Sequence, residues 1–271
     1  MQPGGLPKIS LPNMRNLLAV ASGKGGVGKS TVATNLALAL AANGHRVGLL
    51  DADIYGPSVP LMMGIQGQID QKAVPLPIER YGIKLMSMGF LVPPEKAVIW
   101  RGPMIHRALT QFLTELPWGD LDYLIIDLPP GTGDAQLTLT QTVPLTAAVV
   151  VTTPQEVSLI DARKGLEMFR EVKVPVLGII ENMSYFVGDD GKRYEIFGHG
   201  GGQRLARAAE VPFLGDIPID PQVVKCGDGG QPMVMAHPES LVAKAYKGLA
   251  QVVERELATI PEAPSLPGLS I

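Results

Sequence analysis

The sequence reads Ser22-Gly-Lys-Gly-Gly-Val-Gly-Lys-Ser-Thr31 between a short apolar run, Leu17–Ala21, and a segment with helical spacing, Thr31–Asn43. It contains the pattern G-x-x-x-x-G-K-[ST], whose glycines let backbone N–H groups turn inward around a phosphate. The N-terminus of the helix behind the loop adds a partial positive charge. A strand before the pattern and a helix after it favour a phosphate-binding loop over an ordinary glycine-rich turn.

Two residues of this loop have specific expected roles. Lys29 should reach the β- and γ-phosphates of a nucleoside triphosphate, and the Ser30 hydroxyl should ligate Mg²⁺. We therefore predict that MgATP or MgADP is the ligand. The expected nucleotide contacts come from Gly23, Lys24, Gly25, Gly26, Val27, Gly28, Lys29, Ser30 and Thr31.

The rest of the chain alternates between two kinds of segment. Short apolar runs bounded by Gly, Pro, Asp or Asn predict strands buried on both faces. Longer stretches with helical spacing separate them, so we expect right-handed crossovers and a doubly wound, mainly parallel α/β sheet of the P-loop NTPase type, flanked by helices. The predicted strands are Leu17–Ala21, Val47–Leu50, Tyr123–Ile126, Ala147–Thr152 and Val176–Ile180, and the predicted helices are Thr31–Asn43, Pro103–Glu115, Glu156–Glu171, Gln203–Glu210 and Leu241–Leu257.

Composition supports a single domain with an aliphatic core. Of the 271 residues 46% are hydrophobic and only 5% are aromatic, as expected for a parallel sheet covered by helices. We predict a flexible lead over residues 1–13, one P-loop domain over 14–259 and a disordered tail over 260–271, which is rich in proline and small residues.

Charge and cysteine content narrow the partners and the compartment. The net charge is −3, so no global positive field recruits nucleic acid or acidic lipid. We find no apolar run near the roughly 18 residues that mark a membrane span, and no apolar core of a signal peptide near Met1. A single cysteine, Cys226, permits no intrachain disulfide. We expect a cytoplasmic protein that binds neither nucleic acid nor membrane.

Three aspartates follow or end predicted strands and are expected near the loop. An acid at the end of a buried strand needs a cation or good hydrogen-bond donors. Asp127 fits the residue that holds Mg²⁺ through water, Asp53 fits the residue that orients the attacking water, and Asp51 fits the metal shell. The alternative is that these acids cap the turns that follow them. For Asp134 we favour a helix cap.

The segment Gly23–Lys29, with its second lysine at Lys24, resembles the deviant Walker A motif of the MinD/ParA/Mrp class of ATPases. The resemblance implies a homodimer in which Lys24 contacts the nucleotide bound by the partner subunit and supplies positive charge to the transition state. It also implies that Asn182 hydrogen-bonds the adenine and that the segment with Pro218 and Asp220 closes over the base.

Further segments resemble the Mrp-type iron–sulfur cluster carriers within that class. That resemblance implies a dimer that binds a cluster and passes it to apo-proteins, with slow ATP hydrolysis controlling the process. The segments that carry it are Asp51–Ser58, Trp100–Met104, Asp127–Asp134, Glu181–Tyr185 and Ile196–Gly202.

One departure from the Mrp pattern concerns the cluster itself. The family usually carries a Cys-x-x-Cys pair before the Phe-Gly-His-Gly segment, and here that place, Val187–Arg193, contains no cysteine. Its composition predicts a polar hairpin turn. Cys226 fits a buried small side chain, and His199 fits a glycine-rich turn better than a ligand set.

Three functions stay open at this stage. The first is an Mrp-type ATPase in iron–sulfur cluster binding and transfer, working with apo-proteins or a cluster-assembly partner. The second is a positioning or partition ATPase like MinD or ParA, and the third is a nucleotide-dependent regulatory module without a cluster. The residues Trp100-Arg101-Gly102-Pro103 are expected at a dimer or client surface.

Overall fold

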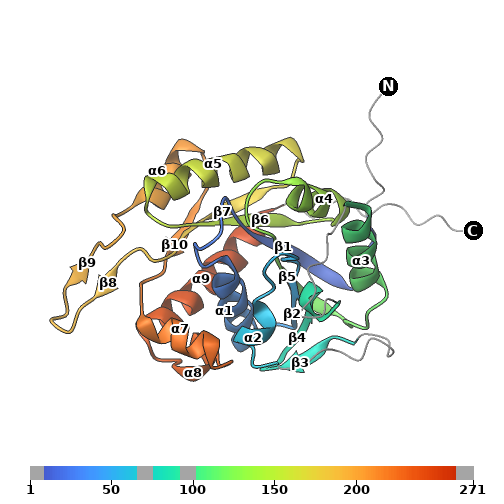
Figure 1. Cartoon of the computed structure of the whole chain (residues 1–271), viewed down its shortest axis with the longest axis horizontal. Helices are drawn as coiled ribbons and strands as arrows, with labels where there is room; N and C mark the ends of the chain where they lie inside the picture. The colour runs from blue at the N-terminus through green and yellow to red at the C-terminus, as the bar shows by residue number, and fades with distance from the viewer. Residues whose placement is uncertain (1–8, 66–75, 92–101, 261–271) are drawn as a thin grey trace, which may run out of the picture.

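The computed structural model describes residues 9–65, 76–91 and 102–260, which form an eight-stranded sheet in the order β10-β7-β6-β1-β5-β2-β4-β3 (Figure 1). All neighbouring strands pair in parallel except β3 and β4, which pair antiparallel. The strands are β1 (Met14–Ser22), β2 (Val47–Asp51), β3 (Ile78–Arg80), β4 (Ile83–Ser87), β5 (Leu121–Asp127), β6 (Ala147–Thr152), β7 (Val176–Glu181) and β10 (Phe213–Asp216).

Helices cover both faces of this sheet, which confirms the predicted doubly wound α/β fold (Figure 1). On one face α1 packs against α9, α2 and α8, while α3 with α4 and α5 with α6 form pairs of their own. The helices are α1 (Lys29–Ala42), α2 (Val59–Met62), α3 (Gly102–Thr114), α4 (Asp134–Thr142), α5 (Glu156–Glu171), α6 (Gly201–Ala208), α7 (Pro221–Asp228), α8 (Met233–Ala236) and α9 (Leu241–Leu257), with a 3₁₀ turn η1 (Met88–Leu91).

Helix α1 is more deeply buried than its sequence suggested. The helical spacing of Thr31–Asn43 predicts one apolar face with Val32, Leu36 and Leu40, but every residue from Val32 to Leu40 is buried. The reason is that α1 lies between the sheet and α9, so both of its sides meet protein. The many alanines of α1 allow these two close approaches.

The predicted strands and helices are all present, with ends that move by at most a few residues. No predicted range covers β3, β4, β10 or the short helices α2, α4, α7 and α8, because segments this short have little periodicity. The predictions for Trp100, Arg101 and most of the lead and tail lie outside the described residues. No described helix is both long and apolar enough to cross a membrane.

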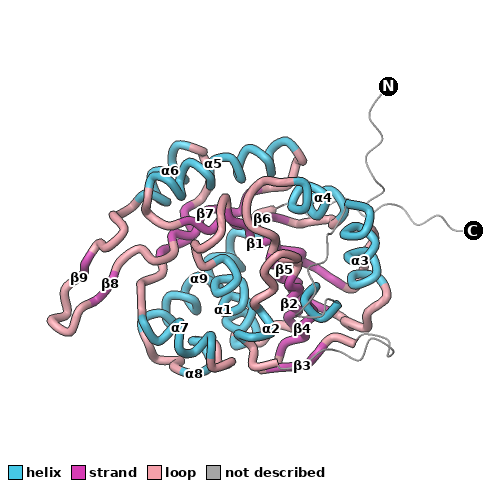
Figure 2. Tube along the Cα trace, in the orientation of Figure 1, coloured by secondary structure: helices cyan, strands magenta, loops and turns pink. Residues whose placement is uncertain are grey.

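A two-stranded hairpin leaves the body of the molecule, as Figure 2 shows clearly. It is formed by β8 (Phe186–Val187) and β9 (Arg193–Tyr194), which confirms the predicted hairpin turn between them. We call residues 185–199 the arm. Every residue from Asp189 to His199 is exposed.

Two glycines join distant parts of the chain beside α7. Gly230, which follows α7, has φ 71°, and a Cβ built on it would lie 2.3 Å from the Cα atom of Gly64. The Tyr81 hydroxyl also donates to the Gly230 carbonyl at 2.8 Å. This close approach of two backbones requires glycine at residue 230.

We therefore predict that Gly230→Ala lowers the free energy of unfolding by about 2 kcal/mol or more, because left-handed backbone strain and a backbone clash add together. The matched control is Gly248→Ala in the middle of α9, where a Cβ would meet no atom within 4 Å. That control should stabilise the protein by about 0.5–1 kcal/mol. Urea denaturation measures both changes, and equal effects of the two variants would contradict this account.

Candidate nucleotide-binding site

The loop between β1 and α1 is built to expose backbone N–H groups. Gly26 and Gly28 both have φ 81°, and Gly28 precedes α1 without a side-chain cap for the helix. A Cβ on Gly23 would lie 2.1 Å from the Asp161 carbonyl carbon, so the loop packs directly against α5. The first-turn amides of α1 thus remain available to a phosphate.

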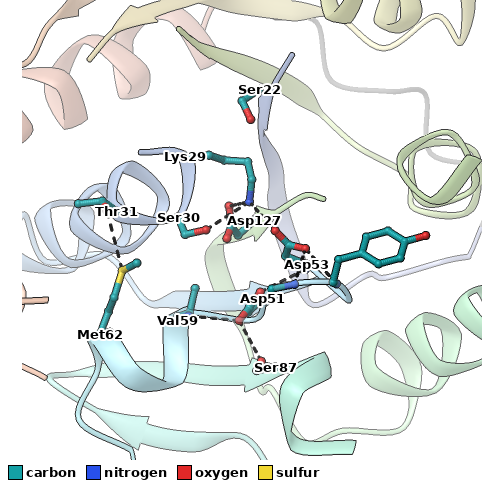
Figure 3. Close-up of polar contacts among 12 residues, drawn as sticks. Ser22, Lys29, Ser30, Thr31, Asp51, Asp53, Val59, Met62, Ser87 and Asp127 are labelled. Carbon is teal, nitrogen blue, oxygen red and sulfur yellow. Dashed lines mark hydrogen bonds and ion pairs between the residues drawn. The ribbon is translucent and has the colours of Figure 1, made fainter. Parts of the chain in front are cut away.

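The loop lysine points into a group of buried acids (Figure 3). Lys29 Nζ lies 2.7 Å from Asp127 Oδ1 and 3.6 Å from Asp53 Oδ2. Burial raises the pKa of Asp127, and the charge and hydrogen bond of Lys29 oppose that rise. The structure therefore brings together Lys29, Asp53 and Asp127 as the sequence predicted, from the loop and from the ends of two strands.

The residues at this position fit Mg²⁺. The second oxygen of Asp127, Oδ2, is buried without a hydrogen-bond partner, and the Ser30 hydroxyl lies 3.3 Å from Lys29 Nζ in the same group. The described residues contain no cluster of three His, Cys, Asp or Glu that could hold a metal by themselves. Ser30 and Asp127 suit a cation that takes its remaining ligands from phosphate and water.

Asp51 has a different environment from the other two acids. Its Oδ2 accepts a hydrogen bond from Ser87 Oγ at 3.0 Å and one from the Val59 amide, and its Oδ1 accepts one from the Asp53 amide. Burial, followed by the charge of Asp127, raises its pKa to about 8. These contacts favour the turn-capping alternative for Asp51 over a place in the metal shell.

Asp53 is held by the turn that follows it. Its Oδ1 accepts hydrogen bonds from the Tyr55 and Gly56 amides, each at 3.2 Å, which leaves Oδ2 facing Lys29. The carboxylate is therefore fixed beside the loop. Tyr55 itself is 71% exposed.

A cavity of about 370 Å³ begins at Gly28 and Thr31 and extends away from the acids. It brings together Asn182, Pro218 and Asp220, the three residues predicted to surround the base. Asn182 Nδ2 donates to the Val27 carbonyl at 2.8 Å, so this side chain is attached to the loop itself. The cavity size is typical of small-ligand sites.

Other predicted residues lie apart from this group. Cys226 is buried within α7, and His199 is exposed at the end of the arm, where its ring lies 3.8 Å from Glu195. Asp134 is the first residue of α4, but Gly133 is at the N-cap position, so the predicted cap is displaced by one residue. The charge of Asp134 still lies in the first turn, where the helix dipole favours it.

A second cavity, of about 400 Å³, lies at the opposite ends of the strands and is lined by several charged residues. Its cations are already engaged: Arg46 pairs with Asp122, and Lys84 Nζ donates to the Trp118 carbonyl. The guanidinium of Arg80 donates to the Met63 carbonyl. These contacts give it a structural role, and the loop cavity is the candidate functional site.

Comparisons with known proteins agree with this geometry. The family model described as NUBPL iron-transfer P-loop NTPase matches residues 13–254. An iron-sulfur cluster carrier protein of Aquifex aeolicus is 54% identical over 250 residues, which are 90% of this chain and 69% of the relative.

Two solved structures have the same fold. One is a nucleotide-binding protein from Archaeoglobus fulgidus in complex with ADP, with TM-score 0.70 and 42% identity over 82% of this chain and 88% of that one. The other is the cell division ATPase MinD of Pyrococcus furiosus, with TM-score 0.65 and 22% identity over 89% and 98%. At this identity, MinD shows similarity of fold alone.

The buried ion pair predicts a difference between the two loop lysines. Lys29→Met should lower the free energy of unfolding by about 1–3 kcal/mol at pH 7, because it leaves buried carboxylates without their cation. Lys24 has no ion-pair partner among the described residues and is only half-buried, so Lys24→Met is the matched control and should change stability little. Thermal and urea unfolding measure both, and equal losses would contradict the assigned environment of Lys29.

Proposed function

We propose, from the premise that the chain belongs to the NUBPL iron-transfer family of P-loop NTPases, that it hydrolyses MgATP and uses this reaction to control iron–sulfur cluster transfer. The observation that carries the nucleotide part is the buried contact of Lys29 with Asp127 and Asp53 beneath the glycine-rich loop. The similarity to carriers such as that of Aquifex aeolicus supports the cluster part.

The arrangement suits phosphoryl transfer to water. The loop amides and Lys29 would hold the β- and γ-phosphates, while Asp53 would orient a water molecule in line with the γ-phosphorus. A bond then forms from the water oxygen to phosphorus, the bond to the β–γ bridging oxygen breaks, and ADP and inorganic phosphate leave. Bound Mg²⁺ neutralises phosphate charge, and Ser30 and Asp127 are the residues that would hold it.

We propose that efficient ATP hydrolysis at this site needs a second subunit. Lys24 lies in the loop without an ion-pair partner in the described part of the chain, and its ammonium is free to meet an anion. We propose that two copies of the chain meet at this face and that Lys24 of each copy contacts the phosphates bound by the other. The intrinsic turnover of a single subunit should accordingly be slow.

Asn182, Pro218 and Asp220 are proposed to select the base. The three residues line the cavity that continues from the loop, which supports adenine as its occupant. Asp220 also caps α7 through the Gln222 amide at 2.8 Å, so its carboxylate is fixed in direction. Asp220 would then serve both in recognition of the base and in capping of α7.

The cluster ligands are proposed to come from a partner protein. An iron–sulfur cluster takes about four thiolates. This chain has one cysteine, Cys226. Burial raises the pKa of its thiol and so disfavours the thiolate, which is the form that binds metal. We propose that the cluster is cargo held by a cluster-assembly partner or an apo-protein in the cytoplasm, and that nucleotide controls contact with that partner.

The cross-subunit role of Lys24 predicts a separation of binding from hydrolysis. Lys24→Ala should bind MgATP nearly as well as the unchanged protein. It should release phosphate about 100-fold more slowly, because one charged donor to the transition state is lost. Lys29→Ala is the comparison and should lose binding itself. Phosphate release and calorimetry measure the two quantities, and full activity of Lys24→Ala would rule out the role.

The cluster proposal predicts the outcome of anaerobic reconstitution with iron and sulfide. The protein alone should remain colourless, with no stoichiometric iron, and the same should hold for Cys226→Ser. Addition of the protein with MgATP to a cluster-loaded thiol donor should accelerate activation of an apo-ferredoxin. A stable chromophore that disappears in Cys226→Ser would contradict the proposal and make Cys226 a ligand.

A further inference from the structure

The arm and the base cavity share residues. Met183 lies two residues before the arm and Phe197 lies in its returning segment, and both line the cavity that contains Asn182. Residues near both ends of the arm therefore form part of the cavity wall. Phe197 is 37% exposed, so this aromatic side chain lines the cavity and also reaches the surface. Gly28 of the phosphate loop lines the same cavity.

The outgoing segment of the arm is hydrogen-bonded to the opposite wall of the cavity. The Ser184 amide donates to the Ile217 carbonyl at 3.0 Å, and the Ile219 amide donates to the Tyr185 carbonyl at 2.6 Å. Phe186 and Ile219 form an isolated parallel bridge. Pro218 lies within this paired segment, so the arm is hydrogen-bonded to the part of the wall that was predicted to cover the base.

One buried acid anchors both ends of the arm. The Glu181 carboxylate, 1% exposed, accepts a hydrogen bond from Ser184 Oγ at 2.5 Å on the outgoing side. On the returning side it accepts from the Gly200 and Gly202 amides at 3.3 and 2.5 Å. The N-terminus of α6 stabilises this buried charge. Glu181 directly precedes Asn182, so the arm and the residue predicted to bind the base have a common foundation.

We propose that Phe197 packs against the base of the bound nucleotide and thereby fixes the position of the arm. This inference rests on the proposed nucleotide function and adds a residue and a consequence to it. The chemistry is the stacking of a purine on an aromatic ring, for which Asn182 supplies the polar contact and Phe197 the apolar face. Nucleotide occupancy then determines where the arm presents Tyr194 and Ile196, which are 45% and 56% exposed.

Calorimetric titration of three proteins with two ligands tests the contact. The unchanged chain, Phe197→Ala and the control Tyr194→Ala are titrated with MgADP and with magnesium tripolyphosphate, which has phosphates but no base. Phe197→Ala should bind MgADP about 5- to 100-fold more weakly, the range that stacking on one base gives. Its tripolyphosphate affinity should not change, Tyr194→Ala should match the unchanged chain, and Phe197→Tyr should restore MgADP binding.

Tryptic cleavage at the arm tip tests the consequence. Lys192 and Arg193 are exposed beside the hairpin turn and provide a cleavage site. MgADP should slow cleavage there in the unchanged chain and leave its rate unaltered in Phe197→Ala, when each protein is saturated with ligand.

The outcomes separate the two levels of the proposal. If the unchanged chain bound neither ligand, the proposed nucleotide function would fail. If it bound MgADP but Phe197→Ala bound it equally well, only the assignment of Phe197 would be overturned. An equal loss of MgADP and tripolyphosphate binding in Phe197→Ala, with an unaltered circular dichroism spectrum, would likewise overturn it, because Phe197 would then only support the fold of the loop.

Discussion

The Lys29 ammonium lies against the Asp127 carboxylate at a place that water does not reach, since their side chains are only 6% and 0% exposed. Charges are costly in such surroundings unless each has a partner with good geometry. The loop must therefore hold its lysine over the end of β5, and α1 must begin directly behind it. The turn after β2 has to direct Asp53 to the same ammonium.

The strand order of the parallel sheet brings these charged side chains together. β1 lies between β5 and β6, and β2 lies beside β5 with Asp51 in register with Asp127. The carboxyl ends of these strands consequently share one edge, where the loop and the acids converge. β7 ends at the same edge, and its last residue, Glu181, anchors the arm. The positions of the buried charges, of the cavity beside Asn182 and of the arm thus all depend on one strand order.

Much of this could be predicted from sequence because the signals are local. Each signal spans only a few residues: the glycine loop, an apolar run, or the acid that follows a strand. The fold and the group of Lys29, Asp53 and Asp127 could therefore be predicted. Three features could not be predicted: the Ser87 contact that engages Asp51, the hydrogen bonds of Glu181 to both ends of the arm, and the position of Phe197 in the cavity beside Asn182. Each depends on residues that meet only after folding, and an acid at the end of β7 was the available signal for Glu181.

We propose that the candidate nucleotide site and the arm act as one unit. Hydrogen exchange of the unchanged chain, measured by mass spectrometry with and without a non-hydrolysable MgATP analogue, tests it directly. We expect slower exchange in the loop Gly23–Thr31, at Asn182 and Met183, and in the returning segment of the arm around Phe197. Protection confined to the loop, with the arm unchanged at saturating ligand, would contradict it.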